Sequence, residues 1–104
     1  MEWYHNLYVG RLIHPRRDKV IEEIDQGRYP AFVYLLILPG SGHSQLEIIG
    51  AQELKHDYVR ENCLQIVGIA QGKTEALSLL EQLMQDVYRS RKDADIRAWL
   101  NIAE

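Results

Sequence analysis

CLQIVGIAQGKTEALSLLEQLMQDVYRSR, from Cys63 to Arg91, decides the fold class of this chain. Its first eight residues, Cys63 to Ala70, form an apolar run of strand length, and Gln71-Gly72 then makes a tight turn. From about Lys73 to Arg91 the apolar residues recur at helical spacing: Ala76, Leu77, Leu80, Leu83, Met84, Val87 and Tyr88. A strand that leads directly into a long amphipathic helix predicts an α/β protein.

Two further strand and helix pairs are predicted upstream of this unit. Residues 7–13 contain Tyr, Val and Ile, which favour extended backbone, whereas Gly10 weakens the pattern, so whether this segment joins the sheet stays open. His14-Pro15 then predicts a helix start, and Gly27 a helix end, with Val20, Ile21 and Ile24 at helical spacing between them.

The second strand, Ala31 to Leu38, is apolar throughout except for a tyrosine hydroxyl, which is typical of a strand covered on both faces in a parallel sheet. Residues 44–56 are ambiguous. Ser44 and Glu47 fit a capping box, which favours a short, broken helix, but Ile48-Ile49 would also suit an edge strand.

A final short helix is predicted after Asp93, its N-cap, because Ile96, Trp99 and Leu100 share one helical face. Residues 1–104 are therefore expected to form a small single-domain α/β sandwich. It should contain about three mainly parallel strands with flanking helices, in the order β-α-β-α-β-α-α.

Composition excludes several classes of partner and compartment. The chain has 104 residues, 46% of them hydrophobic, and a net charge of −3, so no nucleic-acid partner is expected. The longest apolar run, Ala31 to Leu38, is too short to cross a membrane. One cysteine and an N-terminus without a signal pattern predict a cytoplasmic protein.

The segment GIAQGKTEAL, residues 68–77, resembles a phosphate-binding loop but has one residue too few between its glycines. If the second and third strands were parallel neighbours, the loops that follow them would meet at one edge of the sheet. The residues that could then bind a small anion are Ser41, Gly42, His43, Ser44, Gly72, Lys73 and Thr74.

No catalytic residue, metal ligand set or cofactor motif is apparent. The hydrolase elbow G-x-S-x-G is missing, and His5, His14, His43 and His56 lack zinc-site spacing. Cys63, alone at the start of a strand, is expected to be a small buried hydrophobe.

Large aromatic side chains lie near both ends of the chain: Trp3, Tyr4, Tyr8 and Trp99. They are expected to cover an open edge or face of the sheet. Alternatively, some of them form a self-association patch, because aromatics are favoured at the centres of interfaces.

The opening residues Glu2-Trp3-Tyr4 and Leu7 to Gly10, with the later VGIAQGKTEALSLL, resemble a group of small bacterial α/β proteins. Members of that group open with an E-W-Y-x-x-L-Y-V-G-like stretch and carry V-x-G-I-A-x-G-x-x-E-A-L. The resemblance implies one small α/β domain and supplies no site residues.

Because no constellation fixes a reaction, the leading hypothesis is a non-catalytic intracellular domain that binds a protein partner or self-associates, for example as a homodimer. A small anionic-ligand binder that uses the two loops is the alternative. An enzyme of unidentified class is the third hypothesis.

Overall fold

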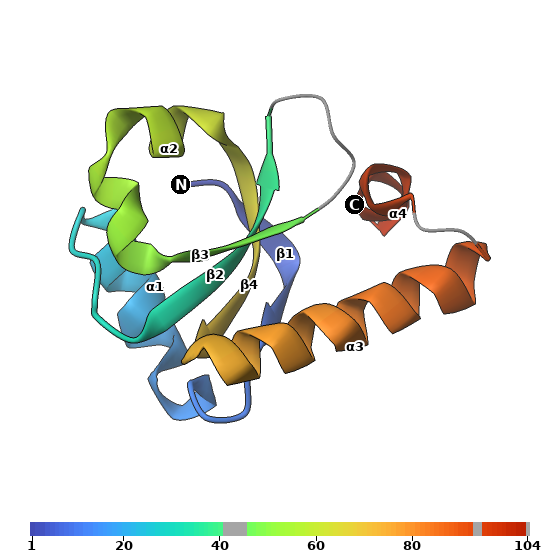
Figure 1. Cartoon of the computed structure of the whole chain (residues 1–104), viewed down its shortest axis with the longest axis horizontal. Helices are drawn as coiled ribbons and strands as arrows, with labels where there is room; N and C mark the ends of the chain where they lie inside the picture. The colour runs from blue at the N-terminus through green and yellow to red at the C-terminus, as the bar shows by residue number, and fades with distance from the viewer. Residues whose placement is uncertain (41–45, 93–94, 104) are drawn as a thin grey trace.

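Four strands form a single sheet in the order β1-β4-β2-β3 (Figure 1). The computed structural model describes residues 1–40, 46–92 and 95–103. The strands are β1 (Trp3–Val9), β2 (Val33–Pro39), β3 (Glu47–Gly50) and β4 (Cys63–Gln71). The chain is thus an α/β protein, with β1 and β3 at the two edges of the sheet.

The sheet is mixed, and the prediction of about three mainly parallel strands is wrong. β1 runs parallel to β4, but β2 is antiparallel to both of its neighbours, β4 and β3. Val33 lies opposite Gln71, and Pro39 lies opposite Cys63. The apolar character of β2 arises because helices cover both faces of the sheet, and this does not require parallel pairing.

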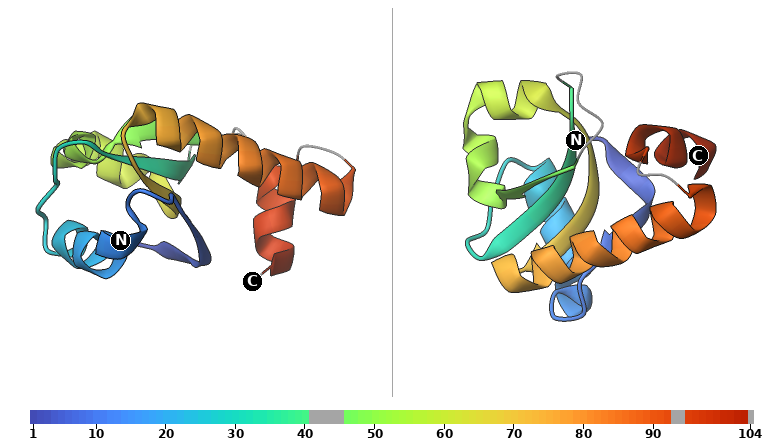
Figure 2. Two further views of the ribbon diagram at one scale, coloured as in Figure 1. Left: turned by 90° about the horizontal axis from the view of Figure 1, so that it is seen from below. Right: turned by 45° about the vertical axis from the view of Figure 1, so that its right-hand side comes forward.

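Helices lie on both faces of the sheet (Figure 2). One face carries α1 (Arg17–Asp25), the 3-10 helix η2 (Ala51–Lys55) and α2 (Asp57–Asn62). The other carries α3 (Lys73–Arg91) and α4 (Ile96–Ala103). A short 3-10 turn, η1 (His14–Arg16), precedes α1.

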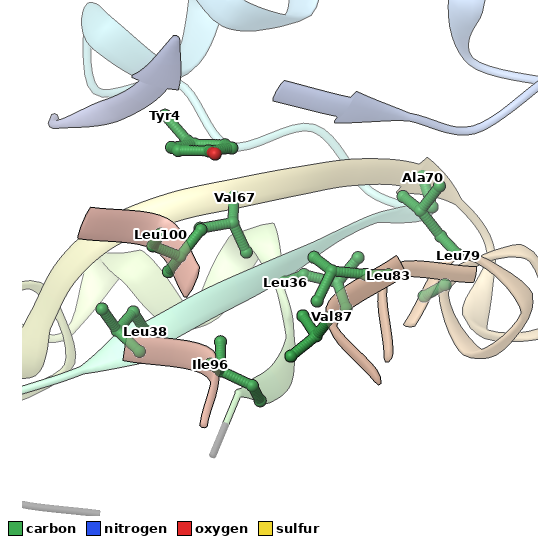
Figure 3. Close-up of a cluster of buried hydrophobic side chains, with 11 residues drawn as sticks. Tyr4, Leu36, Leu38, Val67, Ala70, Leu79, Leu83, Val87, Ile96 and Leu100 are labelled. Atoms are coloured by element: carbon green, nitrogen blue, oxygen red, sulfur yellow. The ribbon is translucent and has the colours of Figure 1, made fainter. Parts of the chain in front are cut away.

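The core consists of two apolar clusters, one on each side of the sheet. On the α3 side, Leu36 and Val67 of the sheet are fully buried beneath α3 and α4 (Figure 3). The helical residues of this cluster are Ala76, Leu79, Leu83, Val87, Ile96 and Leu100. On the opposite side, the buried residues are Ile13, Val20, Ile24, Val33, Leu35, Ile37, Ile49, Ala51, Leu54, Ile66 and Ile69.

The predicted unit of strand, turn and long helix is confirmed: β4 begins at Cys63 and α3 spans the predicted residues. The first helix is confirmed too, with η1 as its opening turn and Gly27 in the left-handed conformation (φ 82°) after its end. The first strand does join the sheet, but it spans Trp3–Val9 and not 7–13. The Gly10 amide still bonds to the Ile69 carbonyl of β4, and the strand ends because the chain turns at residues 11–13.

The ambiguous segment contains both kinds of structure. Residues 47–50 form the edge strand β3, and η2 follows, so the favoured broken helix is only partly right. The Gly50 amide donates to the Glu53 carboxylate at 2.9 Å, which fixes the start of η2. Ser44 of the predicted capping box lies outside the described residues.

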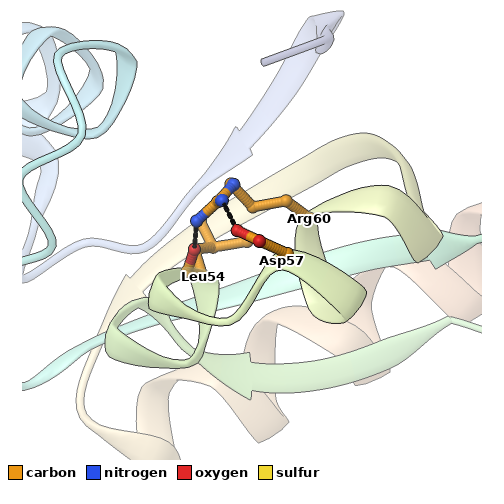
Figure 4. A network of polar contacts seen from close by, with 3 residues as sticks. All are labelled: Leu54, Asp57 and Arg60. Carbon is orange, nitrogen blue, oxygen red and sulfur yellow. Dashed lines mark hydrogen bonds and ion pairs between the residues drawn. The ribbon is translucent and has the colours of Figure 1, made fainter.

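Arg60 joins η2 to α2 (Figure 4). Its guanidinium donates to the Leu54 carbonyl at 2.5 Å and pairs with the Asp57 carboxylate. Because this contact closes the turn between two short helices, it holds both of them over the sheet.

The terminal aromatics cover the sheet, which supports the first of their two interpretations. Tyr4 is buried in the core, and the Trp3 indole donates to the Asp25 carboxylate at 2.8 Å. Trp99 of α4 lies 6.3 Å from the rings of both Tyr4 and Tyr8. Asp95 accepts the Ala98 amide at 3.1 Å and so caps α4, whereas the predicted cap Asp93 lies outside the described residues.

Candidate interaction surface

The two loops predicted to bind an anion follow strands that end at opposite ends of the sheet. The Gly40 amide donates to the Asn62 carbonyl, next to the start of β4. The Gly72 amide donates to the Phe32 carbonyl, at the other end of β4. The expected convergence required parallel neighbours, and β2 and β4 are antiparallel. Ser41, Gly42, His43 and Ser44 themselves lie outside the described residues.

The N-terminus of α3 is built around a carboxylate of the chain itself. Gly72 is its N-cap, with φ 83°, and Lys73 and Thr74 are exposed. The Glu75 carboxylate accepts the Gln71 amide at 2.9 Å and the Leu12 amide at 2.7 Å. An acidic group already lies beside this helix end, so the Gly-Lys-Thr sequence is explained by the turn from strand to helix.

Glu75 also contacts Gly10. This contact brings together the opening motif that ends at Gly10 and the later motif VGIAQGKTEALSLL. A Cβ placed on Gly10 would lie 2.0 Å from Oε1 of Glu75, so any larger residue at position 10 would force this carboxylate to move. Through Glu75, the turn after β1 and the turn after β4 are held together. Both motif residues therefore have a structural explanation.

The described residues contain no group of three or more His, Cys, Asp or Glu placed to hold a metal ion. Cys63 is half-buried, and burial raises the pKa of its thiol to about 11, which disfavours a nucleophilic thiolate at neutral pH. Among the described helices, none has the length and apolar character needed to span a bilayer.

The most prominent unexplained feature is an apolar row along one side of α3, beside its buried face. We define the α3 flank as Leu77, Leu80, Met84 and Tyr88. Each helical residue advances the side-chain direction by about 100°, so these four lie beside the buried row formed by Ala76, Leu79, Leu83 and Val87. Leu77 is 51% and Tyr88 62% exposed, and the other two are half-buried.

Two polar contacts fix the direction in which the α3 flank faces. The Tyr8 hydroxyl donates to Asp86 at 2.5 Å, and Glu75 bonds to the turn after β1. The side of α3 that carries these acidic residues therefore faces β1. The α3 flank lies on the other side of the helix, towards β2 and β3, where Tyr34 and Ile48 are only half-buried.

A rim of charged and polar side chains borders the outer half of the α3 flank. Glu81, Gln85, Arg89 and Lys92 line an open hollow of about 590 Å³ together with Met84 and Tyr88. Apolar side chains at the centre and charged groups around them are the usual composition of a protein interface.

The sequence pattern did not separate this row from the core. Leu77, Leu80, Met84 and Tyr88 were all assigned to the core-facing stripe, together with Ala76, Leu83 and Val87. The signal that could have separated the two rows is the width of the apolar stripe. Apolar residues at both 76-77 and 87-88 cover a wider arc of the helix than one sheet can bury.

Comparison with known proteins adds no relative. The chain matches no protein-family model, no curated protein and no solved structure.

Proposed function

We propose that the protein is a non-catalytic interaction domain that works by burying the α3 flank against another folded chain. The observation that carries this proposal is the row of Leu77, Leu80, Met84 and Tyr88 on a well-anchored helix, in which the exposed Leu77 and Tyr88 lie at either end of the half-buried Leu80 and Met84. The anion-binding alternative loses its support, because it depended on two strands being parallel.

The exposure of this row is costly for an isolated domain. Burying a leucine or an aromatic side chain contributes about 1.5–3 kcal/mol relative to leaving it in water. Leu77 and Tyr88 forgo about half of that contribution, although the same helix buries four other apolar residues completely or almost completely. Exposed apolar side chains that form a contiguous patch mark interaction sites, whereas single ones do not.

The helix that carries the α3 flank is firmly anchored, which favours specific binding. α3 is anchored by the buried Leu83 and Val87, by the Tyr8–Asp86 hydrogen bond and by the Glu75 contacts. A surface that is ordered before binding loses little conformational entropy when the complex forms.

Site-specific photo-cross-linking tests this function. The full chain, carrying benzoylphenylalanine in place of Tyr88, is irradiated in the cells that express it, and the adduct is identified by mass spectrometry. We expect one discrete adduct that disappears when Leu77→Gln is added, because the glutamine removes apolar area from the same α3 flank.

The matched control places the same probe at Gln82, which is exposed on the β1 side of the same helix. This control should give no discrete adduct. Equal labelling from both positions, or an adduct at position 88 that Leu77→Gln leaves unchanged, would refute the proposed function.

A further inference from the structure

We infer that the protein docks on anionic membranes through the end of the domain where β1 and β4 finish and β2 begins. Leu12 and Phe32 enter the lipid interface there, and basic side chains meet the headgroups. We call this surface the basic tip and define it as Arg11, Leu12, Arg16, Phe32 and Lys73. The inference goes beyond the proposed function, because it assigns a second surface and a different class of partner.

Two loops that carry exposed apolar side chains are tied to the start of α3. The Leu12 amide donates to the Glu75 carboxylate at 2.7 Å, and the Gly72 amide donates to the Phe32 carbonyl, also at 2.7 Å. Gly72 is the N-cap of α3, and Glu75 lies in its first turn. Leu12 and Phe32 therefore lie at one end of the domain, at the lower left of Figure 1.

Both apolar side chains of the basic tip project into solvent. Leu12 is 64% and Phe32 80% exposed. Phe32 has the left-handed backbone conformation (φ 67°), which is rare for a bulky residue. Its carbonyl is held there by the Gly72 amide, so the backbone itself keeps the ring outside the core.

Basic side chains surround the two apolar ones. Arg11 directly precedes Leu12, and Lys73 is the first residue of α3. The Arg16 guanidinium donates to the side chain of Gln71, the last residue of β4. All three basic residues are exposed, so positive charge lies next to the apolar side chains.

The acidic side chains of the neighbouring segments already have partners within the chain. Glu75 accepts the Gln71 and Leu12 amides, and Asp18 pairs with Arg17 at 3.1 Å. The whole chain has a net charge of −3, so the positive charge of the basic tip is a local feature. Charge complementarity therefore favours an anionic partner for this end of the domain.

A lipid surface matches both properties of the basic tip. Anionic headgroups attract Lys and Arg, and Leu and Phe side chains enter the boundary between headgroups and acyl chains. A nucleic acid would match the cations through its phosphates, but it offers no apolar site for Leu12. Docking on a surface requires no membrane-spanning segment. With two apolar side chains and few cations, this binding is weak and reversible.

The orientation of α3 makes this docking compatible with the proposed function. α3 begins at the basic tip and leads away from it (Figure 1). Met84 and Tyr88 of the α3 flank thus lie far from the end that meets the lipid. A molecule docked through the basic tip would keep these residues accessible to another folded chain.

Sedimentation with vesicles tests the docking. The full chain is mixed with vesicles made of equal parts phosphatidylcholine and phosphatidylserine, and separately with vesicles of phosphatidylcholine alone. We expect binding to the anionic vesicles only, and this binding should weaken as the salt concentration rises, because exposed charges are screened. A chain that does not bind the anionic vesicles at millimolar lipid overturns the inference, and so does a chain that binds single-stranded RNA in their place.

Phe32→Asn removes the ring without disturbing the fold, because asparagine tolerates the left-handed conformation. Its affinity for the anionic vesicles should fall about tenfold. Tyr58→Asn is the matched control, since Tyr58 is 71% exposed on α2, which leads into the opposite end of β4. This control should bind like the wild type. Equal losses in the two variants would show that Phe32 has no special part in docking.

A second matched pair tests the charges. Lys73→Gln and Arg89→Gln each remove one positive charge from α3, at opposite ends of the helix. Lys73→Gln should weaken vesicle binding about fivefold, and Arg89→Gln should leave it unchanged. If both variants lose affinity equally, the overall charge governs the binding and the basic tip is not the docking surface.

A fluorophore that responds to its surroundings reads the entry into lipid directly. It is attached to Leu12→Cys in a Cys63→Ser background, and to Tyr58→Cys in the same background as the control. Its emission should shift to the blue on anionic vesicles at position 12 and stay unchanged at position 58. An unchanged emission at position 12 in the vesicle-bound protein would overturn the proposed entry of Leu12 into the lipid interface.

Discussion

Replacing Gly10 by alanine should destabilise the fold only through its effect on Glu75. The added Cβ would lie 2.0 Å from Oε1 and 2.7 Å from Cγ of Glu75, so the carboxylate must move away. It then loses the hydrogen bonds to the Gln71 and Leu12 amides. Gly10 itself has no left-handed backbone conformation, so alanine is otherwise tolerated there.

The magnitude follows from those two hydrogen bonds. A hydrogen bond to a charged group contributes about 1.5–3 kcal/mol, and the low end applies because the Glu75 side chain is half-exposed. Gly10→Ala should therefore lower the free energy of unfolding by about 2–3 kcal/mol, and Glu75→Ala by a similar amount. The double variant should lose about 2–3 kcal/mol and not the sum of the two, because the second change removes nothing more.

Urea denaturation followed by circular dichroism gives the four free energies of this double-mutant cycle. Gly50→Ala is the control. Its Cβ would meet no atom closer than 3.9 Å, so it should change the stability by less than about 0.5 kcal/mol. Additive losses in the Gly10 and Glu75 double variant would refute the reasoning, since they would show that the two residues act independently.

Three further outcomes are expected. Leu83→Ala should cost about 2–5 kcal/mol in a denaturant melt at low protein concentration, whereas Leu77→Ala should cost less than about 0.5, because only Leu83 is buried in the single chain. The Cys63 thiol, titrated by its absorbance at 240 nm, should show a pKa of about 11, and a pKa near the ordinary value of ~8.5 would contradict its burial. Burial and the hydrogen bond to Asp86 raise the pKa of Tyr8. The neutral phenol is thus favoured in the folded state, so wild-type stability should fall as the pH rises above ~10, and Tyr8→Phe should weaken that fall.

Local sequence patterns were sufficient to predict the elements whose ends are marked by a glycine or a proline in the sequence. β4 and α3 follow from an apolar run, Gly72 and a long periodic stripe, and the structure has them at the predicted residues. The first helix follows in the same way from Pro15 and Gly27. In each case the deciding signal lies within a few residues of the boundary.

Strand direction was not predictable from such signals. β2 is apolar on both faces, which is typical of parallel sheets, yet here its two faces are covered by helices from distant parts of the chain. The four-residue strand β3 was obscured because Leu46, Ile49 and Leu54 also fit a helix. Because residues 47–50 were not recognised as a strand, their antiparallel pairing with β2 could not be predicted.

The two candidate sites depend on different features of the sequence. Placing Gly72, Lys73 and Thr74 beside the loop after β2 depended on strand direction, so the error in topology removed its support. The α3 flank depends only on the helical period of α3, which the sequence does encode. What the sequence could not tell is which half of the wide apolar stripe the sheet would cover, because that depends on where β1, β2 and β4 lie beneath the helix.

Photo-cross-linking from position 88 tests the central claim most directly. With benzoylphenylalanine in place of the exposed Tyr88, the full chain should form one discrete adduct with another folded chain, and the same probe at Gln82 should form none. A Leu77→Gln variant that carries the probe at position 88, equally stable in a denaturant melt, should lose this adduct. The account is contradicted if Leu77→Gln leaves the adduct unchanged, because the α3 flank would then not be the surface through which the protein acts.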